Sequence, residues 1–519
     1  MEPDVSYLDA YFQHIKESGC ELSRLSLLKV KQQLLDTQWQ TPQTAVDFNN
    51  VGVVALIEAQ RSSDEFSRKL FFEMAVEALD QGAKMGHPLC QAHLALSYSL
   101  IGELDEAIKL AFTSFIQYLQ ATFDSHYTIP AGLIFLPTKV ETEPGQPTDL
   151  QELLLESDGY TQALKLSAWA LCFAQFVFYN ASGLRLLQLA VQQLPDSIVL
   201  NLQAGISHLV AQRQEGLYFL QRARGLAPDS SPAMQALAIA YRDQGNIALA
   251  QTWLDRGKGM QSHQSREWRW AELAVDSSFT YLTFEPDLLL AVEPSFRSIV
   301  TSVLLAQGDW FEKEMEFWRH WLKPGMTVID VGANAGVYTF SAARQVGSTG
   351  KVLAVEPFSG CVRLLKETCR VNSLGWVKVC AGAASDRNGI SKLAVQSASE
   401  LNQLMEGEVE GAFEEIECFT LDSLCEREGL SQVDFLKIDA EGHEVPVLQG
   451  SQNLLEQSRP VILYENISGS QGSNLAVSEF LVAKGYRLHY YQPFLKELVE
   501  ISSSQDIQGK LNIIALPEK

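Results

Sequence analysis

The hydrophobic pattern of this 519-residue chain changes near residue 275, and this change restricts the possible folds more than any other feature. Before it, apolar residues recur three or four positions apart, which predicts one helix after another. After it, short β-rich runs alternate with helical stretches, which predicts a mostly parallel sheet covered on both faces. We therefore expect two domains, an α-helical one at 1–275 and an α/β one at 276–519.

Composition narrows the possible functions. Hydrophobic residues make up 46% of the chain, so each domain can bury a core. The formal net charge of −23 disfavours nucleic acid as a partner, because a polyanion is repelled. The longest apolar run covers 12 residues, 168–179, whereas a membrane-spanning helix needs about 20. No signal peptide and no zinc-spaced cysteines are apparent, so we expect a cytoplasmic protein without a membrane span.

Two segments of the helical part share the pattern Leu-Ala, Tyr, Gly, Ala at identical offsets. The first is Leu94, Ala95, Tyr98, Gly102 and Ala107, and the second is Leu237, Ala238, Tyr241, Gly245 and Ala250. The small residues let two helices approach closely, and the glycine permits the turn between them. The pattern resembles the tetratricopeptide repeat, which implies helical pairs that recruit an acceptor, a carrier or a partner protein. An irregular helical bundle without a binding role is the alternative.

Seven β-rich runs follow in the second part. They are Thr327–Val331, Lys351–Val355, Val377–Cys380, Phe435–Asp439, Val461–Glu465, Arg487–Tyr491 and Asn512–Leu516. Helical stretches at 337–347, 358–372 and 443–457 supply the crossovers that parallel strands need. In such sheets ligands bind at the carboxyl ends of the strands, where the strand order reverses.

The first run ends in the turn Asp330-Val-Gly332-Ala-Asn334-Ala-Gly336. The two glycines allow the close backbone approach that a nucleotide-like ligand requires, but Asn334 replaces the middle glycine of the dinucleotide fingerprint. This replacement argues against NAD. Glu356 ends the next run and is suited to binding both hydroxyls of a ribose. An acidic turn followed by an acidic strand end suits S-adenosylmethionine, with S-adenosylhomocysteine as the product.

The fourth run leads into Asp439, Glu441 and His443. Asp439, at the strand end, could position or deprotonate an acceptor hydroxyl, and His443 is a candidate general base or a cap on the next helix. Glu441 could bind a divalent cation with Asp439, but two carboxylates alone do not define a metal site, so a cation is possible without being indicated. Tyr464 and Glu465, in the fifth run, could line an acceptor pocket or simply pack.

The motifs VIDVGANAGVYT, AVEP, VDFLKIDAEGHEVPVLQG, RPVILYE and NIIALP resemble those of FkbM-type methyltransferases over about residues 280–519. The resemblance implies a Rossmann-like class I fold with a seven-stranded sheet and methyl transfer from S-adenosylmethionine to a hydroxyl of a sugar or natural product. A protein methyltransferase whose repeat groove holds a polypeptide, and a non-catalytic scaffold, remain as alternatives.

The resemblance also assigns residues. It implies contacts to the amino-acid part of the cofactor from Asp330, Gly332, Asn334 and Gly336, to the ribose from Glu356 and to the adenine from Asp386. Asp386 could instead belong only to a turn before Arg387. The stretch 307–312 matches a Gly-x-Trp-Glu element of the family with one inserted residue, Phe311, so the role of Glu312 stays open.

Overall fold

The structure is a computed structural model that describes residues 6–17, 28–30, 32, 42–121, 129–137, 158–174, 181–260, 265–395, 403–405, 412–467 and 473–518. Contacts group the chain into two compact units. Unit 1 is Met1–Pro228 with Gln492–Glu497, and unit 2 is Asp229–Tyr491 with Leu498–Lys519. Each unit is considered by itself.

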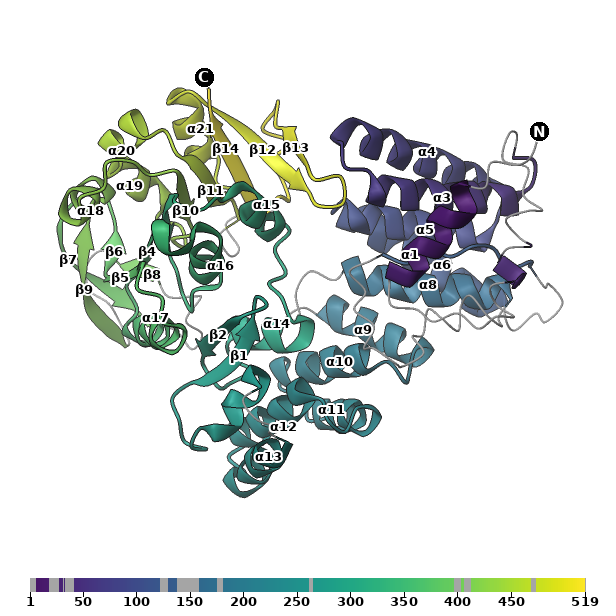
Figure 1. Ribbon diagram of the computed structural model, residues 1–519, viewed down its shortest axis with the longest axis horizontal. Coiled ribbons are helices and arrows are strands. Elements are labelled where there is room, and N and C mark those ends of the chain that lie inside the picture. The colour runs from purple at the N-terminus through teal and green to yellow at the C-terminus, as the bar shows by residue number, and fades with distance from the viewer. Residues whose placement is uncertain are drawn as a thin grey trace. The chain divides into compact units, whose positions relative to one another are not determined.

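Unit 1 is helical, as the apolar spacing predicts (Figure 1). Its described helices are α1 (Ser6–Glu17), α3 (Ala45–Arg61), α4 (Glu65–Lys84), α5 (Pro88–Leu100), α6 (Leu104–Ala121), α8 (Gly159–Ala174), α9 (Ala181–Gln193), α10 (Ile198–Val210) and α11 (Gly216–Leu226). Short turns join α3 to α4, α5 to α6 and α10 to α11, so the members of each pair run antiparallel.

The residues that suggested a repeat occupy matching places. Gly102, after α5, and Gly245, after α12 (Ser231–Asp243), both have left-handed backbone angles, with φ of 78° and 75°. Ala107 and Ala250 are buried in the helices that follow, α6 and α13 (Ile247–Met260). Gln212 takes the left-handed conformation between α10 and α11. The two predicted copies lie in different units, and the tetratricopeptide assignment stays a prediction.

An irregular segment of unit 1, 129–137, runs against these helices and is hydrogen-bonded by their side chains. The amide of Asn49 donates to the carbonyl of Leu133 at 2.9 Å, and the carbonyl oxygen of the Asn50 side chain accepts from the N–H of Leu133 at 2.9 Å. The side chains of 133–136 are fully or almost fully buried. The asparagines thus satisfy backbone groups that have no place in a helix or sheet.

Unit 2 is built around an eight-stranded sheet, with strand order β13-β12-β14-β11-β10-β3-β4-β5. Its strands are β3 (Thr327–Val331), β4 (Lys351–Glu356), β5 (Val377–Ala381), β10 (Phe435–Ile438), β11 (Val461–Glu465), β12 (Tyr486–Gln492), β13 (Glu497–Glu500) and β14 (Asn512–Pro517). The sheet is parallel from β5 to β11, and β14 is antiparallel to both of its neighbours. All seven predicted runs are strands.

The prediction of seven strands is wrong by one, because β13 adds an eighth at the edge of the sheet. The sequence of β13 is Glu-Leu-Val-Glu, and its residues are partly or fully exposed. An edge strand pairs on one side only and needs no buried apolar run, so the hydrophobic pattern gave no signal for it. Two smaller sheets were also not anticipated. One is the hairpin of β1 (Thr280–Phe284) and β2 (Leu288–Val292). The other consists, in spatial order, of β6 (Ala383–Ala384), β9 (Phe413–Phe419), β7 (Gly389–Ala394) and β8 (Gln403–Met405).

Helices flank the main sheet (Figure 1). They include α15 (Glu314–Trp321), α16 (Val337–Val346), α17 (Ser359–Asn372), α18 (Leu421–Glu428), α19 (Glu444–Gln449), α20 (Gln452–Gln457) and α21 (Leu475–Ala483). Helix α14 (Ile299–Gln307) packs instead against β1 and α12. The predicted helix 443–457 is broken between α19 and α20 at Gly450, where a Cβ would lie 2.0 Å from the carbonyl oxygen of Ser385. Close backbone packing therefore interrupts this crossover.

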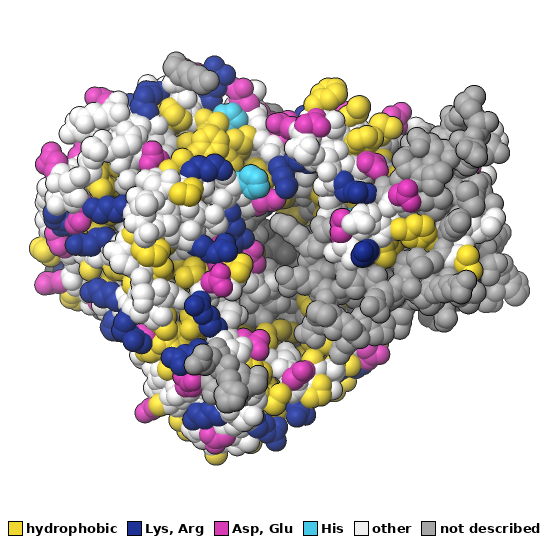
Figure 2. Space-filling model, in the orientation of Figure 1, with side chains coloured by type: hydrophobic (Ala, Val, Ile, Leu, Met, Phe, Trp, Pro, Cys, Tyr) yellow, Lys and Arg dark blue, Asp and Glu magenta, His cyan; other side chains and the backbone are white. Residues whose placement is uncertain are grey.

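Charge and apolar character are mixed on the surface. Figure 2 shows acidic, basic and apolar side chains interspersed on one face of the molecule. Within the residues that the structure describes, no helix combines the length and the apolar character needed to cross a membrane.

The ends of β3 and β10 meet at Gly332, which has a φ of 76°. A Cβ on Gly332 would lie 1.7 Å from the carbonyl oxygen of Asp439. No side chain can be accommodated there unless the two strand ends move apart. Gly308 is a suitable comparison, because its φ of 72° is similar but a Cβ added there would meet no neighbouring atoms.

We predict that Gly332→Ala lowers the free energy of unfolding by about 2–5 kcal/mol, the sum of left-handed strain and overpacking. The matched control Gly308→Ala should lose only about 1–2 kcal/mol, because strain is its sole cost. Chemical denaturation of both variants measures the difference. Equal losses would contradict the close approach of the strand ends.

Candidate functional site

The strand order reverses between β3 and β10. From β3 the chain moves outward to β4 and β5 on one side, and later returns to place β10 and β11 on the other. The register aligns Asp330 on β3 with Lys437 on β10, so both side chains lie on the same face. Such a switch point leaves a crevice at the carboxyl ends of the strands, where ligands of α/β proteins bind.

The glycine turn after β3 lies at this switch point. Gly332 and Asn334 both have positive φ angles, and the N–H of Gly332 donates to the carbonyl of Val355 at 3.0 Å. Gly336 has a φ of 96°, and a Cβ there would lie 2.4 Å from the ring of Phe340. Side chains are thus excluded at both glycines by neighbouring protein atoms, which gives the turn the tight backbone path typical of nucleoside-binding turns.

Glu356, at the end of β4, lies beside this turn. One carboxylate oxygen accepts from the N–H of Asn334 at 2.8 Å, and the other accepts from the N–H of Phe358 at 2.8 Å. Burial raises the pKa of Glu356 to about 7, although the two backbone donors act in the opposite direction. Each oxygen keeps a second lone pair, so the fixed carboxyl can accept two further hydrogen bonds, as a ribose diol would provide.

Asp330 is almost completely buried at the end of β3. One of its oxygens accepts from the hydroxyl of Thr339 at 2.5 Å, and the other finds no partner among the described residues. Burial raises the pKa of Asp330, and the nearby ammonium of Lys437 works against this rise. A buried carboxylate oxygen without a partner is costly, so a donor from a ligand is the expected complement.

Lys437 and Asp439 form a buried ion pair in which Nζ lies 2.9 Å from Oδ2. The side chain of Lys437 is 4% exposed, and that of Asp439 is 32% exposed. Burial by itself lowers the pKa of Lys437, but the carboxylates of Asp439, Asp330 and Glu312 outweigh it and raise the pKa above the ordinary value. Lys437 is therefore charged, and breaking such a pair typically costs about 3–5 kcal/mol.

Glu312 lies close to Lys437, and its role stays a prediction. The hydroxyl of Tyr338 donates to Glu312 at 2.7 Å, and the amide of Asn512 donates to the same oxygen at 2.8 Å. The Nζ of Lys437 lies 4.7 Å from the ring centroid of Tyr338. Burial raises the pKa of Glu312. No sequence motif indicates that Tyr338 and Asn512 contact Glu312.

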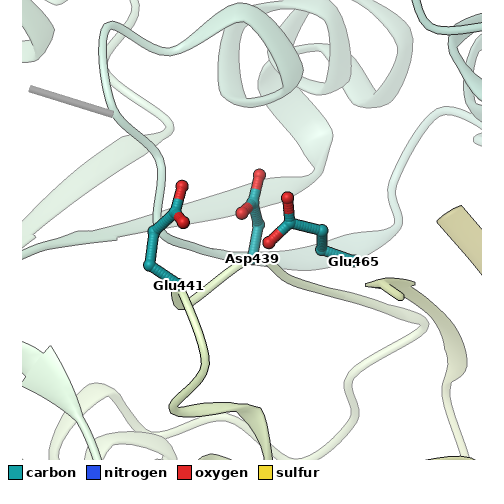
Figure 3. Close-up of side chains that lie close together, drawn as sticks. All are labelled: Asp439, Glu441 and Glu465. Carbon is teal, nitrogen blue, oxygen red and sulfur yellow. The ribbon is translucent and has the colours of Figure 1, made fainter. Parts of the chain in front are cut away.

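Asp439, Glu441 and Glu465 point their carboxylates toward one another (Figure 3), with oxygen atoms within 4.8 Å. β10 ends before Asp439, and Glu441 has a φ of 49°, so a turn rather than a continued strand brings them together. Burial and the carboxylates around it raise the pKa of Glu465. Three carboxylates so placed could hold a cation, but they also arise without one.

Tyr464 and Glu465, which the sequence placed either in an acceptor pocket or in the core, have different surroundings on β11. Tyr464 is fully buried, and its hydroxyl lies 2.8 Å from that of Ser478, so it packs in the core. Glu465 points to the other face and joins the carboxylates described above. It shares the signal that identified Asp330 and Glu356, namely an acidic residue at the end of a buried apolar strand.

Glu444 fixes the turn that carries Asp439 and Glu441. One of its oxygens accepts from the N–H groups of Ala440 and Gly442, at 3.1 and 3.0 Å. The other accepts from the amide of Asn474 at 2.9 Å. Because Glu444 is fully buried, these bonds hold the turn rigidly against α19.

His443 occupies the N-cap position of α19, but its side chain makes no capping hydrogen bond. Its Nε2 lies 3.0 Å from the hydroxyl of Ser385, which also donates to Asp386 at 3.1 Å. The Asp386 carboxylate is exposed, and it accepts from Arg387 at 3.3 Å. The structure thus joins His443 to the segment expected to contact adenine, and the roles of His443 and Asp386 remain predictions.

Among solved structures, similar folds include a methyltransferase FkbM from Methylobacillus flagellatus KT, with 14% identity, a TM-score of 0.25, and coverage of 42% of this chain and 53% of that one. An O-methyltransferase from Bacillus cereus in complex with SAH has 18% identity, a TM-score of 0.25, and coverage of 40% and 83%. MamA of AMB-1 has 15% identity, a TM-score of 0.27, and coverage of 43% and 94%.

The family comparison is more specific. No curated protein matches the chain significantly. Residues 330–488 match the family described as the methyltransferase FkbM domain. The matched stretch begins at Asp330 and contains Gly332, Glu356 and Asp439. This part of unit 2 is therefore similar to the methyltransferase FkbM domain.

Proposed function

We propose that the protein is an S-adenosylmethionine-dependent methyltransferase that methylates a hydroxyl group of a sugar, glycan or natural product. The observation that carries the proposal is the set of residues that meet at the carboxyl ends of β3 and β4. A turn without side chains at Gly332 and Gly336 adjoins the fixed carboxyl of Glu356 and the unpartnered oxygen of Asp330. These features fit a nucleoside that bears an amino acid.

When bound, S-adenosylmethionine supplies an electrophilic methyl group on a sulfonium. The residues of the chain then have binding roles. Asp330 accepts from the amino-acid part through the oxygen that has no protein partner, and the turn at Gly332 and Asn334 presents its backbone to the same part. Glu356 accepts from the ribose hydroxyls, and Asp386 accepts from the adenine amine.

Methyl transfer needs the acceptor oxygen in line with the methyl group and a place for its proton. Asp439 is partly exposed at the end of β10, next to the glycine turn, and we assign it to positioning or deprotonating the acceptor. His443 is the second candidate base, because it follows the same acidic turn and its imidazole is held by Ser385. Glu441 completes the acceptor side. A divalent cation stays possible without being required.

The helical repeats are assigned to recruiting the acceptor, its carrier or a partner protein in the cytoplasm. The alternative of a polypeptide held in a repeat groove has one observation against it. In unit 1 the asparagines that could hold an extended backbone, Asn49 and Asn50, already bond Leu133 of the same chain. The alternative of an inactive scaffold explains neither Glu356 nor Asp330, because the fold alone requires neither carboxylate.

We predict that Asp330→Asn and Glu356→Gln each weaken S-adenosylmethionine binding at least tenfold, about 1.4 kcal/mol, because each removes a charged acceptor. Isothermal titration calorimetry measures the affinity, and a thermal melt checks that each variant is folded. Glu426→Gln, on the exposed part of α18, is the control and should bind as the parent does. Unchanged affinity in both site variants would remove the cofactor assignment.

Cofactor affinity should rise with pH. Glu356 has a pKa of about 7, and only its ionised form accepts two ribose hydroxyls without giving up an oxygen to a proton. Affinity is therefore weak below this pKa and should increase about tenfold between pH 6 and pH 8. In Glu356→Gln the cofactor affinity should lack this increase with pH. A parent profile that matches the variant profile would contradict the role of Glu356.

His443→Ala should lower turnover and leave cofactor affinity within about twofold, because the imidazole acts on the acceptor proton, for which general base catalysis contributes about 10²–10⁴-fold. Transfer of radiolabelled methyl groups to a panel of methyl glycosides and polyols measures turnover. Parent-like turnover in this variant would exclude His443 from the reaction.

A further inference from the structure

The buried ammonium of Lys437 is unusual for its place in the fold. Lys437 lies inside β10, the central strand next to β3, and its residue exposure is 3%. Burying a charge in a sheet is expensive, and a well-packed apolar side chain at such a position is often equally stable or more so. The stability of the fold therefore does not explain the lysine.

Three groups surround this ammonium. The Nζ atom donates to Oδ2 of Asp439 at 2.9 Å and lies 4.7 Å from the ring centroid of Tyr338. The carboxylate of Asp330 is its cross-strand neighbour on β3. Lys437 therefore contacts Asp439, the carboxylate assigned to the acceptor, and neighbours Asp330, a carboxylate assigned to the cofactor.

Asp439, the ion-pair partner of this ammonium, is one of the three carboxylates that converge in Figure 3. The ammonium binds one oxygen of Asp439 and thereby fixes the plane of the carboxylate, because the two oxygens and their carbon are rigid. The second oxygen, Oδ1, keeps its lone pairs for another donor.

We propose that Lys437 is a positioning residue for methyl transfer: it holds Oδ2 of Asp439 so that Oδ1 accepts the acceptor hydroxyl. This inference rests on the proposed function and extends it, because the acceptor is then aligned by a group that does not touch it. Misplacement of a reacting group by about 1 Å can lower a rate about 100-fold, so a rigid support for Asp439 has catalytic value.

Tyr338 and Glu312 form the second layer of this support. The hydroxyl of Tyr338 donates to Glu312 at 2.7 Å, which fixes the ring whose face lies against the ammonium. Asn512, on β14, donates to the same carboxylate at 2.8 Å. The segment ahead of β3, helix α16 and strand β14 thus jointly hold Lys437 in place.

Crystal structures of the full-length parent and of Lys437→Met, each grown with S-adenosylhomocysteine, test the proposal. We expect the carboxylate of Asp439 to move by about 1 Å or more, or to turn away, in the variant. The matched control is Lys351→Met, which removes an ammonium that donates to the carbonyl of Glu428 at the amino end of the same sheet. In the control Asp439 should stay in place.

An Asp439 carboxylate that keeps its position in Lys437→Met would overturn the proposal and leave the lysine a purely structural role. A cation bound by Asp439, Glu441 and Glu465 in the parent crystal, with Lys437 released from Oδ2, would overturn it as well. Calorimetry of the parent with S-adenosylmethionine decides the proposed function separately, because the position of Asp439 can be read whether or not the ligand binds.

If Lys437→Met does not fold, the double variant with Asp439→Asn decides instead. If Lys437 acts through Asp439, removing both charges restores folding. The effects of the two substitutions on the free energy of unfolding, measured by urea denaturation, are then strongly non-additive. A double variant that also fails to fold would show a role for Lys437 independent of Asp439 and would overturn the proposal.

Discussion

The contact between Gly332 and the carbonyl of Asp439 is the constraint on which the candidate site depends. It brings the carboxyl ends of β3 and β10 together, with no room for a Cβ between them. Because the strand order reverses at this pair, the glycine turn and the acidic turn lie side by side at the same edge of the sheet. In the proposed function, the first turn holds the cofactor and the second turn holds the acceptor.

Charge balance is the second determinant of the site. Asp330, Asp439 and Glu312 surround the ammonium of Lys437, and all three carboxylates act to raise its pKa. One buried cation in a group of acidic side chains cannot neutralise them all, so the pKa values of Asp330 and Glu312 rise with burial. Ligand binding can supply the missing partners, because a methyl donor with a sulfonium and an amino group carries positive charge.

Much of the fold could be read from the hydrophobic pattern. The seven β-rich runs and the residues at their ends, Asp330, Glu356 and Asp439, were identified because buried parallel strands are continuous apolar runs. The edge strand β13 and the helix break at Gly450 could not be identified in this way, because neither depends on local apolar periodicity. One is set by pairing at a sheet edge, and the other by the backbone of Ser385.

The sequence by itself determined the helical and α/β halves, the glycine turn, and the acidic residues at the strand ends, because these follow from periodicity and spacing over a few residues. Only the tertiary structure decided which of these residues are neighbours. Lys437, Tyr338 and Glu312 come from a strand, a helix and a loop, and their contacts depend on strand order and register. Side-chain pairing across the sheet is a long-range property that local sequence does not encode.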